Sequence, residues 1–454
     1  MGNFTGIKFT NKNKMKSPVR RDRSPKHFIL FIAFNGLKGT IPEEIQYLDG
    51  FEILILQDNP GIGGVLPKSM HDLSSLRVLS IHNCSLSGTI PDWIGDLTNM
   101  VNLGLSSNRL SGEIPRTIES LTNLKALGLD NNMLNADLTQ FDTLTKLQYL
   151  YLNDNEIRGT LTSSLLLSWK DMVELDISDN YLSSTLPENI FSHGSLMLLD
   201  LHGNRLTGSI PIVSSHDTNQ LEFLALHANE LEHVVPNSLG LLQKLTHLDL
   251  SMNRLASALP STIGSMFELK YLSVGSNIFN RSPIPSWLGE LTNLEQLKLS
   301  ESQFLGSIPD FIGFNLSNLK HIDLSQNSLT STIPESIGFL SSLENLILES
   351  NQLTGKLPGS IVKLSSMDVL VLDGNNLAGS ADVVCDNLEL EFFAADCGGG
   401  QDAKFKCVCC SVCCRGDQDE GCYDLGWSMD QSFVNENNFE RSRYKLGDGT
   451  MFIP

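Results

Sequence analysis

Residues 103–115 read Leu-Gly-Leu-Ser-Ser-Asn-Arg-Leu-Ser-Gly-Glu-Ile-Pro, and variants of this stretch recur along most of the 454-residue chain. Its asparagine, Asn108, marks a position that can be followed from repeat to repeat. The fifteen marker positions are Asn35, Asn59, Cys84, Asn108, Asn132, Asn155, Asn180, Asn204, Asn229, Asn253, Asn277, Ser302, Asn327, Asn351 and Asn375. Their spacing of about 24 residues predicts a solenoid of stacked coils, each of which contacts only its neighbours.

Each coil carries the pattern of a short strand ahead of its marker. Leu248 and Leu250 stand five and three positions before Asn253, and similar apolar pairs precede the other markers. Alternate residues of a strand share a face, so each pair points inward and the residues between them face solvent. The marker amide can satisfy backbone groups of adjacent coils that have no ladder partner. Ser302 can do this in part, and Cys84 only weakly.

The full consensus, Leu-x-Gly-x-Ile-Pro followed by Ile-Gly-x-Leu-x-x-Leu, resembles that of plant-type leucine-rich-repeat proteins. The resemblance implies an α/β-type repeat solenoid, a curved superhelix of about 15 coils with a parallel β-sheet on its concave face. We expect the solenoid over residues 28–380, after a basic segment at residues 1–27 that is either disordered or incorrectly predicted sequence. A Cys-rich cap at residues 381–422 resembles that of surface leucine-rich-repeat proteins in diatoms and other stramenopiles. A disordered tail follows at residues 423–454.

The charge distribution limits the choice of partners. The net charge is −20, although residues 1–26 carry eight Lys or Arg against Asp22 alone. Such acidity disfavours nucleic acid and anionic membranes and favours cationic proteins or divalent cations. The alternative is that the acidity only keeps a long protein soluble. The apolar run at residues 28–34 is far shorter than the ~20 residues that span a bilayer, so no transmembrane segment is expected in this chain. Family members generally begin with a disulfide-bearing cap, so we expect that upstream sequence, including a signal or membrane anchor, is missing.

Eight of the nine cysteines follow the last coil, whereas Cys84 stands at a marker position. Crowded cysteines in even number beside a solenoid end predict disulfides in an oxidising compartment, with the pairing left open. The disulfide candidates are Cys385, Cys397, Cys407, Cys409, Cys410, Cys413, Cys414 and Cys422. The alternative is a thiolate site for zinc or copper, which would require a cytosolic protein.

Glycosylation sequons give a second indication of compartment. The motif Asn-x-Ser occurs within the coils at Asn83, Asn280 and Asn315, which are therefore candidate glycosylation sites. Pro283 directly follows the second sequon and is expected to lower its use.

The middle coils carry a dense group of aromatic and charged residues at strand positions that face away from the core. Aromatic side chains bury a large area with few rotatable bonds, which favours them at recognition surfaces. Asp176, Asp200 and Asp249 share one strand position and predict an acidic row suited to Lys or Arg on a ligand. The predicted ligand-binding residues of the concave face are Tyr149, Tyr151, Glu174, Asp176, Asp200, His202, Phe223, His227, His247, Asp249 and Tyr271.

These strand positions also admit other interpretations. They form either a ligand site or an ordinary polar surface that tolerates substitution. His202 and His227, on successive coils, could hold a metal with Asp200, but exposed histidines are mostly solvated, so we predict no metal and no cofactor. No nucleotide loop, phosphate cradle, zinc-protease motif or kinase signature occurs, and carboxylates on an open surface are poorly tuned for acid–base chemistry. We predict no catalytic residues and no enzyme.

The resemblance implies a non-catalytic recognition protein, extracellular or at the cell surface, that acts in signalling, defence or adhesion. Fifteen strands at ~4.8 Å spacing give a face about 70 Å long, which suits a protein, peptide or glycan ligand. A membrane co-receptor would then transmit the signal. The alternatives are a secreted inhibitor of a wall-degrading enzyme, a structural or adhesive protein of the cell covering, and an intracellular scaffold.

Overall fold

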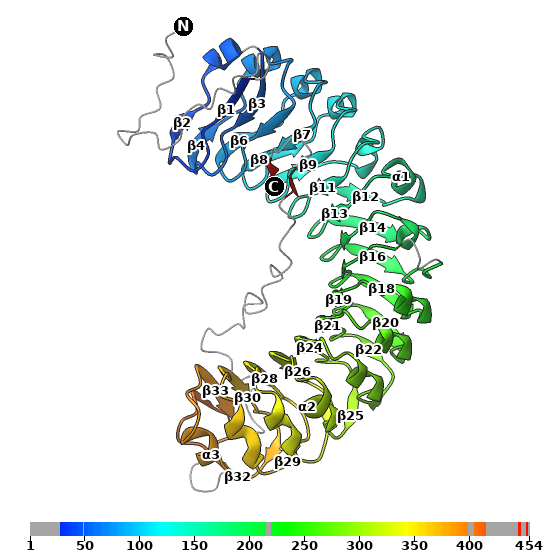
Figure 1. Ribbon diagram of the computed structural model, residues 1–454, viewed down its shortest axis with the longest axis vertical. Helices are drawn as coiled ribbons and strands as arrows, with labels where there is room; N and C mark the ends of the chain where they lie inside the picture. The colour runs from blue at the N-terminus through cyan, green and yellow to red at the C-terminus, as the bar shows by residue number, and fades with distance from the viewer. Residues whose placement is uncertain are drawn as a thin grey trace. The chain divides into compact units, whose positions relative to one another are not determined.

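A computed structural model describes residues 28–48, 50–214, 219–397 and 404–414, and the backbone of two short strands near the C-terminus. The described residues up to Thr207 belong to one compact unit, and those from Gly208 to Cys414 belong to a second. In each unit, one strand per coil enters a parallel ladder, and short helices lie on the opposite side of the coils (Figure 1). The expected repeat solenoid is confirmed in both units.

The main ladder of the first unit, its strand face, pairs successive coils in register. Leu103 of one coil, for example, pairs with Leu127 of the next. Both leucines are fully buried, as the repeat pattern predicts. The strands of this ladder are β1 (Phe28–Phe31), β3 (Phe51–Ile55), β5 (Val78–Ser80), β7 (Asn102–Gly104), β9 (Ala126–Gly128), β11 (Tyr149–Tyr151), β13 (Glu174–Asp176) and β15 (Leu198–Asp200).

The strand face of the second unit is built in the same way. It continues past Ser380, because β33 pairs with β30 and β35 pairs with β33. The strands of this ladder are β17 (Phe223–Ala225), β19 (His247–Asp249), β21 (Tyr271–Ser273), β24 (Gln296–Lys298), β26 (His321–Asp323), β28 (Asn345–Ile347), β30 (Val369–Val371), β33 (Phe392–Ala395) and β35 (Val412–Cys413).

Shorter side ladders form from the residues that follow each marker. In the first unit they are β2 (Lys38–Thr40), β4 (Gly61–Gly64), β6 (Ser85–Gly88), β8 (Arg109–Glu113) and β10 (Met133–Asn135), then β12 (Arg158–Gly159), β14 (Tyr181–Thr185) and β16 (Arg205–Gly208). In the second they are β18 (Glu230–Val234), β20 (Arg254–Ser257) and β22 (Ile278–Phe279), then β23 (Ser282–Pro283), β25 (Phe304–Gly306) and β27 (Ser328–Leu329). The pairs β29 (Thr354–Gly355) with β31 (Asn376–Leu377) and β32 (Gly379–Ser380) with β34 (Phe405–Lys406) complete the set. Near the C-terminus, β36 (Tyr444–Lys445) pairs antiparallel with β37 (Met451–Phe452).

The returning segment of most coils is a single helical turn that starts after proline. Pro115, with φ of −68°, caps the turn that follows it, because its ring fixes φ and needs no hydrogen-bond partner. The turns of the first unit are η1 (Glu43–Leu48), η2 (Lys68–Asp72), η3 (Asp92–Asp96), η4 (Arg116–Ser120), η5 (Leu138–Phe141), α1 (Ser163–Ser168) and η6 (Ile190–Ser192). Those of the second are η7 (Asn237–Leu241), η8 (Ser261–Ser265), η9 (Ser286–Glu290), α2 (Phe311–Asn315), η10 (Glu335–Phe339), η11 (Gly359–Lys363) and α3 (Asp382–Cys385). Within the described ranges, no helix has the length and apolar character needed to cross a membrane.

The marker asparagines join neighbouring coils, as predicted. Asn108 Nδ2 donates to the carbonyls of Ile81 at 2.8 Å and Leu105 at 3.0 Å, while its Oδ1 accepts from the Leu86 N–H at 2.9 Å. Each such bond to a buried backbone group contributes about 1 kcal/mol. The cysteine marker is a weaker substitute, because Cys84 Sγ lies 3.6 Å from a single carbonyl.

The C-terminal cap is cross-linked. Three of its disulfides are Cys385–Cys409, Cys397–Cys413 and Cys407–Cys410. Cys414 is also disulfide-bonded, and Cys422 lies outside the described residues. Among the described cysteines only the buried Cys84 is a free thiol. These bonds agree with the disulfide prediction and leave no thiolates on these cap cysteines for the alternative zinc or copper site.

Candidate functional site

Nine of the eleven predicted ligand-binding residues lie in strands of the strand faces, His202 and His227 follow such strands by two residues, and the set divides between the two units. The first unit contributes Tyr149, Tyr151, Glu174, Asp176, Asp200 and His202, and the second contributes Phe223, His227, His247, Asp249 and Tyr271. Within the first unit, register pairs Tyr151 with Asp176 and Asp176 with Asp200. Within the second, register pairs Phe223 with His247 and His247 with Tyr271.

Many of these side chains are far less exposed than the alternating pattern predicted. Tyr151 and Glu174 are 1% exposed and Asp176 is 2% exposed. Neighbouring strands stand only ~4.8 Å apart, so large side chains at matching register positions cover one another. The expectation that these positions face solvent freely is therefore wrong for the buried ones, which are Tyr151, Glu174, Asp176, Phe223, His227, Asp249 and Tyr271. They form packed polar and aromatic layers on the outer side of the ladder.

The layer in the first unit is a hydrogen-bonded network of carboxylates. The Tyr151 hydroxyl donates to the Glu174 carboxylate, and Asp176 Oδ1 accepts from the Ser178 hydroxyl at 2.6 Å. His202 contacts two carboxylates: its Nδ1 lies 2.6 Å from Asp200 and its Nε2 lies 3.2 Å from Asp179.

The histidine of this network is charged. Burial by itself would lower the pKa of His202, but the hydrogen bonds and charges of Asp179 and Asp200 outweigh it and raise the pKa to about 11. A doubly protonated imidazole has no lone pair for a metal, so a metal ion at this position would have to displace a proton from His202. The same contact neutralises Asp200, so this part of the predicted acidic row attracts cations less than expected.

The second unit carries a column of three stacked rings on adjacent strands. The ring centroids of Phe223 and His247 lie 4.1 Å apart, and those of His247 and Tyr271 lie 4.0 Å apart, with interplanar angles of 17° and 8°. The Lys298 ammonium extends this column, 5.4 Å from the centroid of the Tyr271 ring. We call Phe223, His247, Tyr271 and Lys298 the aromatic column. Because the ring faces cover one another, the column offers mainly ring edges and the lysine charge to a ligand.

Beside the aromatic column, Asp249 is held ionised. Its Oδ2 accepts from the Tyr271 hydroxyl at 3.0 Å and lies 3.8 Å from His227 Nδ1, while its Oδ1 accepts from the Ser251 hydroxyl at 2.6 Å. Burial opposes ionisation of Asp249, but the nearby histidines and the serine hydrogen bonds hold its pKa below the usual value. Asp249 therefore fixes Tyr271 in place in addition to supplying charge.

Sequence reasoning missed two groups of residues. Lys298 occupies the same strand position as Asp249, two coils further on, because Asp249 pairs with Ser273 and Ser273 pairs with Lys298. This shared strand position could have identified Lys298 from the sequence. In the first unit, Arg158 and Arg205 stand on either side of the half-exposed Tyr181 in the side ladder, with guanidinium carbons 5.8 Å and 4.9 Å from its ring centroid. These three residues follow their markers by one to three positions, whereas the ligand-binding residues were predicted from strand positions ahead of the markers.

The three glycosylation candidates of the coils are exposed. The Nδ2 atoms of two of them donate within the protein: Asn83 to Asp58 at 2.8 Å and Asn315 to the Gly289 carbonyl at 3.1 Å. Attachment of a glycan to Asn83 or Asn315 would disturb these hydrogen bonds. Asn280 is therefore the candidate at which glycosylation is expected to disturb the structure least. Glycosylation of all three stays a prediction.

Comparison with known proteins agrees with the architecture. Receptor-like protein 31 of Arabidopsis thaliana is 30% identical over 96 residues, which cover 21% of this chain and only 11% of that relative. The solved structure of a plant peptide hormone receptor, RGFR1 in complex with RGF2, has a TM-score of 0.65 at 30% identity and covers 79% of this chain and 65% of the receptor chain. The Leptospira interrogans leucine-rich-repeat protein LIC12759 has a TM-score of 0.61 at 32% identity and covers 77% of this chain.

Two family models also match the chain. The leucine rich repeat is found at residues 292–353 and, as single repeats, at residues 75–97, 99–121, 171–193, 195–216 and 244–266. The match to the Leptospira protein covers 90% of that protein. Together with the coils, the marker asparagines and the parallel strand faces, these matches show that the chain belongs to the leucine-rich-repeat proteins.

Proposed function

We propose that this chain is an extracellular, non-catalytic recognition protein that binds an extended peptide across the strand face of its second unit. The observation that carries this proposal is the aromatic column: three rings on adjacent strands end in the Lys298 ammonium. Strands repeat at ~4.8 Å and an extended peptide advances ~3.3 Å per residue, so a short peptide laid across the strands touches several coils.

The column is ordered before a ligand arrives, which favours binding. Its rings are held by stacking and by the hydrogen bond from Tyr271 to Asp249. A ligand that meets such a surface does not have to immobilise these side chains, so less of its interaction energy is spent on ordering them. The ring edges offer apolar contact, and Lys298 offers an ammonium to a carbonyl or carboxylate of the ligand.

Two further observations support the compartment and the ligand class. The disulfides of the cap are typical of proteins outside the reducing cytosol. The similar receptor structure is described as a peptide hormone receptor in complex with RGF2, so a related solenoid serves peptide recognition in that protein.

Selection from a randomised peptide library displayed on phage, with the whole disulfide-bonded chain immobilised, tests the proposal. We expect the chain to enrich a peptide consensus, and Tyr271→Ala and Lys298→Glu each to weaken binding of those peptides at least tenfold. Tyr181→Ala in the first unit and Lys363→Glu in η11 are matched controls that should leave binding unchanged. Because Tyr271 is buried, thermal unfolding of each variant must show that it still folds; Lys298→Glu changes only a partly exposed side chain.

Two results would overturn the proposal. One is the absence of any enriched peptide; selective binding to isolated wall polysaccharide would then favour an adhesive role. The other is a peptide consensus whose affinity is the same for wild type, Tyr271→Ala and Lys298→Glu, which would place the peptide site away from the aromatic column.

A further inference from the structure

The side ladder of the second unit is interrupted in the coil that follows Asn277. The strand β22 pairs backward with β20, whereas β23, in the same coil, pairs forward with β25. The markers Asn277, Ser302 and Asn327 are 25 residues apart, and Pro285 comes one residue later after its marker than in most coils. The side ladder is therefore divided in this coil, beside the rim of the strand face. Coil length alone does not divide it, because the Asn59 coil is equally long and its strand β4 pairs with both β2 and β6.

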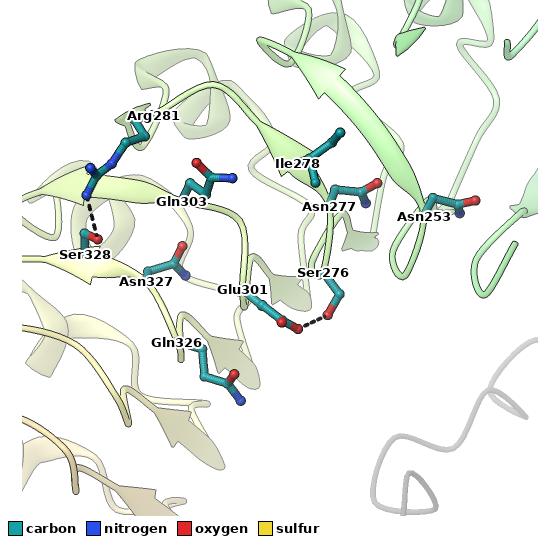
Figure 2. A pocket seen from close by; sticks show the side chains of 10 residues that line it. All are labelled: Asn253, Ser276, Asn277, Ile278, Arg281, Glu301, Gln303, Gln326, Asn327 and Ser328. Carbon is teal, nitrogen blue, oxygen red and sulfur yellow. Dashed lines mark hydrogen bonds between the residues drawn. The ribbon is translucent and has the colours of Figure 1, made fainter. Parts of the chain in front are cut away.

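A polar pocket of about 510 Å³ lies at this interruption (Figure 2). We call it the rim pocket. The side chains that give it character are Arg281, Glu301, Gln303 and Gln326, with Ile278 as the apolar contribution. The marker amides in its wall, such as those of Asn277 and Asn327, already bond backbone groups of adjacent coils and are structural. The ligand-directed groups are therefore one guanidinium, one carboxylate and two carboxamides.

The two charges of the rim pocket are held apart. Arg281 Nη2 donates to the Ser328 hydroxyl at 3.3 Å, two coils further on, and Glu301 Oε2 accepts from the Ser276 hydroxyl at 2.8 Å, as Figure 2 shows. Neither side chain makes an ion pair with any residue that the structure describes. The carboxamides of Gln303 and Gln326 likewise make no side-chain hydrogen bond to the described part of the chain. Each carboxamide can offer both a donor and an acceptor to a ligand.

We propose that the rim pocket is the acid-selective subsite of the peptide site, in which Arg281 pairs with a carboxylate of the ligand. A guanidinium presents its N–H groups as a planar fork that matches a carboxylate. The glutamine carboxamides match the C=O and N–H of a peptide backbone, and Glu301 accepts from a neighbouring N–H donor of the ligand. The pocket contains no aromatic ring on which a sugar ring could stack, which favours a peptide over a glycan.

The rim pocket is within reach of the aromatic column, and this inference rests on the peptide-binding function proposed above. Tyr271 lies in the coil of Ser276, and Lys298 stands three residues before Glu301. Three residues span at most about 10 Å, so a ligand of about five extended residues can contact the column and the pocket together. The carboxylate in question is either an Asp or Glu side chain or the peptide C-terminus.

The same displayed library, selected on the whole chain, tests the subsite. We expect peptides enriched by wild type to carry an acidic residue at one fixed position, and Arg281→Gln to erase that preference while the rest of the consensus persists. Arg281→Glu should replace the acidic residue with Lys or Arg. Arg254→Gln is the matched control, because Arg254 is an exposed arginine one coil earlier that pairs with Glu230 at 3.0 Å, outside the pocket.

Synthetic forms of one enriched peptide separate the two sources of the carboxylate. If the side chain is bound, Asp→Asn or Glu→Gln in the peptide weakens binding at least tenfold and C-terminal amidation does not; if the C-terminus is bound, the reverse holds. An acidic position that persists in Arg281→Gln, or a consensus with no acidic preference and no loss on amidation, would overturn the subsite while the column proposal stands. Failure to enrich any peptide would overturn both.

Discussion

His202 and Asp200 form a charge-assisted pair within a single coil, with Nδ1 of the imidazole 2.6 Å from Oδ1 of the carboxylate. Asp179 of the preceding coil accepts from the other ring nitrogen, so the charged histidine joins two coils of the first unit. The charged imidazole lies among several acidic side chains of this strand face and offsets the repulsion between them.

We expect His202→Gln to lower the free energy of unfolding by about 2 kcal/mol at neutral pH, because hydrogen bonds to charged groups are lost. The exposed His233 gives the control variant, His233→Gln, which should change it by less than about 0.5 kcal/mol. Urea denaturation measures both. Equal stability of the two variants would show that the His202 contacts contribute nothing.

The same histidine predicts a pH dependence. Its pKa is raised to about 11 in the folded protein, against about 6.5 in an unfolded chain. Between these values the folded state binds more protons, so the contribution of His202 is complete below about pH 6.5 and is lost as the pH rises through about 11. The difference in unfolding free energy between wild type and His202→Gln should therefore shrink from about pH 6 to about pH 10. A constant difference over this range would contradict the charged pair.

In the second unit, Glu349 predicts a pH effect through a carboxylate. Burial, with the charges of Asp373 and Asp323 added, raises the pKa of Glu349 to about 7. Because an acid with a raised folded pKa binds more protons when folded, Glu349 does not oppose folding below about pH 4.5, where it is neutral in both states, and its ionisation lowers the stability as the pH rises through about 7. Glu349→Gln should therefore stabilise the protein at pH 8 and have little effect at about pH 4.5. Thermal unfolding of wild type and Glu349→Gln at the two pH values measures this difference. Glu268→Gln, at an exposed position, is the control.

The marker position predicts opposite effects for two substitutions. Asn108→Ala removes bonds to buried backbone groups of Ile81, Leu105 and Leu86 and should destabilise by about 3 kcal/mol. Cys84→Asn restores the consensus amide beside the Leu56 carbonyl, which accepts from Asn59 Nδ2 at 2.8 Å and from the Cys84 sulfur at 3.6 Å; the stronger amide donor should stabilise by about 1 kcal/mol. Denaturant titration measures both changes. A destabilising Cys84→Asn would indicate that this coil has repacked around the thiol.

The cap disulfides should contribute unequally. Cys385–Cys409 closes a separation of 24 residues and Cys407–Cys410 a separation of 3. Chain entropy then predicts about 3.5 kcal/mol for the first and about 2 kcal/mol for the second. The paired variants Cys385→Ser with Cys409→Ser, and Cys407→Ser with Cys410→Ser, can be compared by the rate of limited proteolysis near β33. Faster cleavage in the second variant than in the first would contradict the prediction.

The sequence predicted the features that every coil repeats. The marker asparagine, the inward leucine pair and the proline before the helical turn are each determined by residues of one coil and its neighbour, so periodicity alone reveals them. The burial of Tyr151 and Glu174 was missed because it depends on which large side chains adjacent coils place at the same register position. The disulfide-bonded cap was predicted from cysteine crowding, whereas its pairing required the fold.

The parts of the candidate site that sequence missed arise where coils differ. Arg281 and Glu301 line one pocket at a coil where the side ladder is divided, and the repeat consensus does not predict that division. Lys298 was overlooked because its partner, Tyr271, lies on another coil, and only the register of β21 and β24 brings the two together. Binding residues in irregular coils are therefore the hardest to predict from the repeat pattern of the sequence.

The marker asparagine also affects how such a chain can evolve. A marker asparagine bonds the coil before it, as Asn108 does with Ile81 and Leu86. The next marker, Asn132, bonds the Asn108 coil in the same way through Leu105 and Leu110. Duplication or deletion of one whole coil therefore leaves no buried amide or carbonyl without its partner. The binding face can lengthen or shorten in single steps of ~4.8 Å, so new ligand sizes are accessible through unequal recombination without loss of the fold.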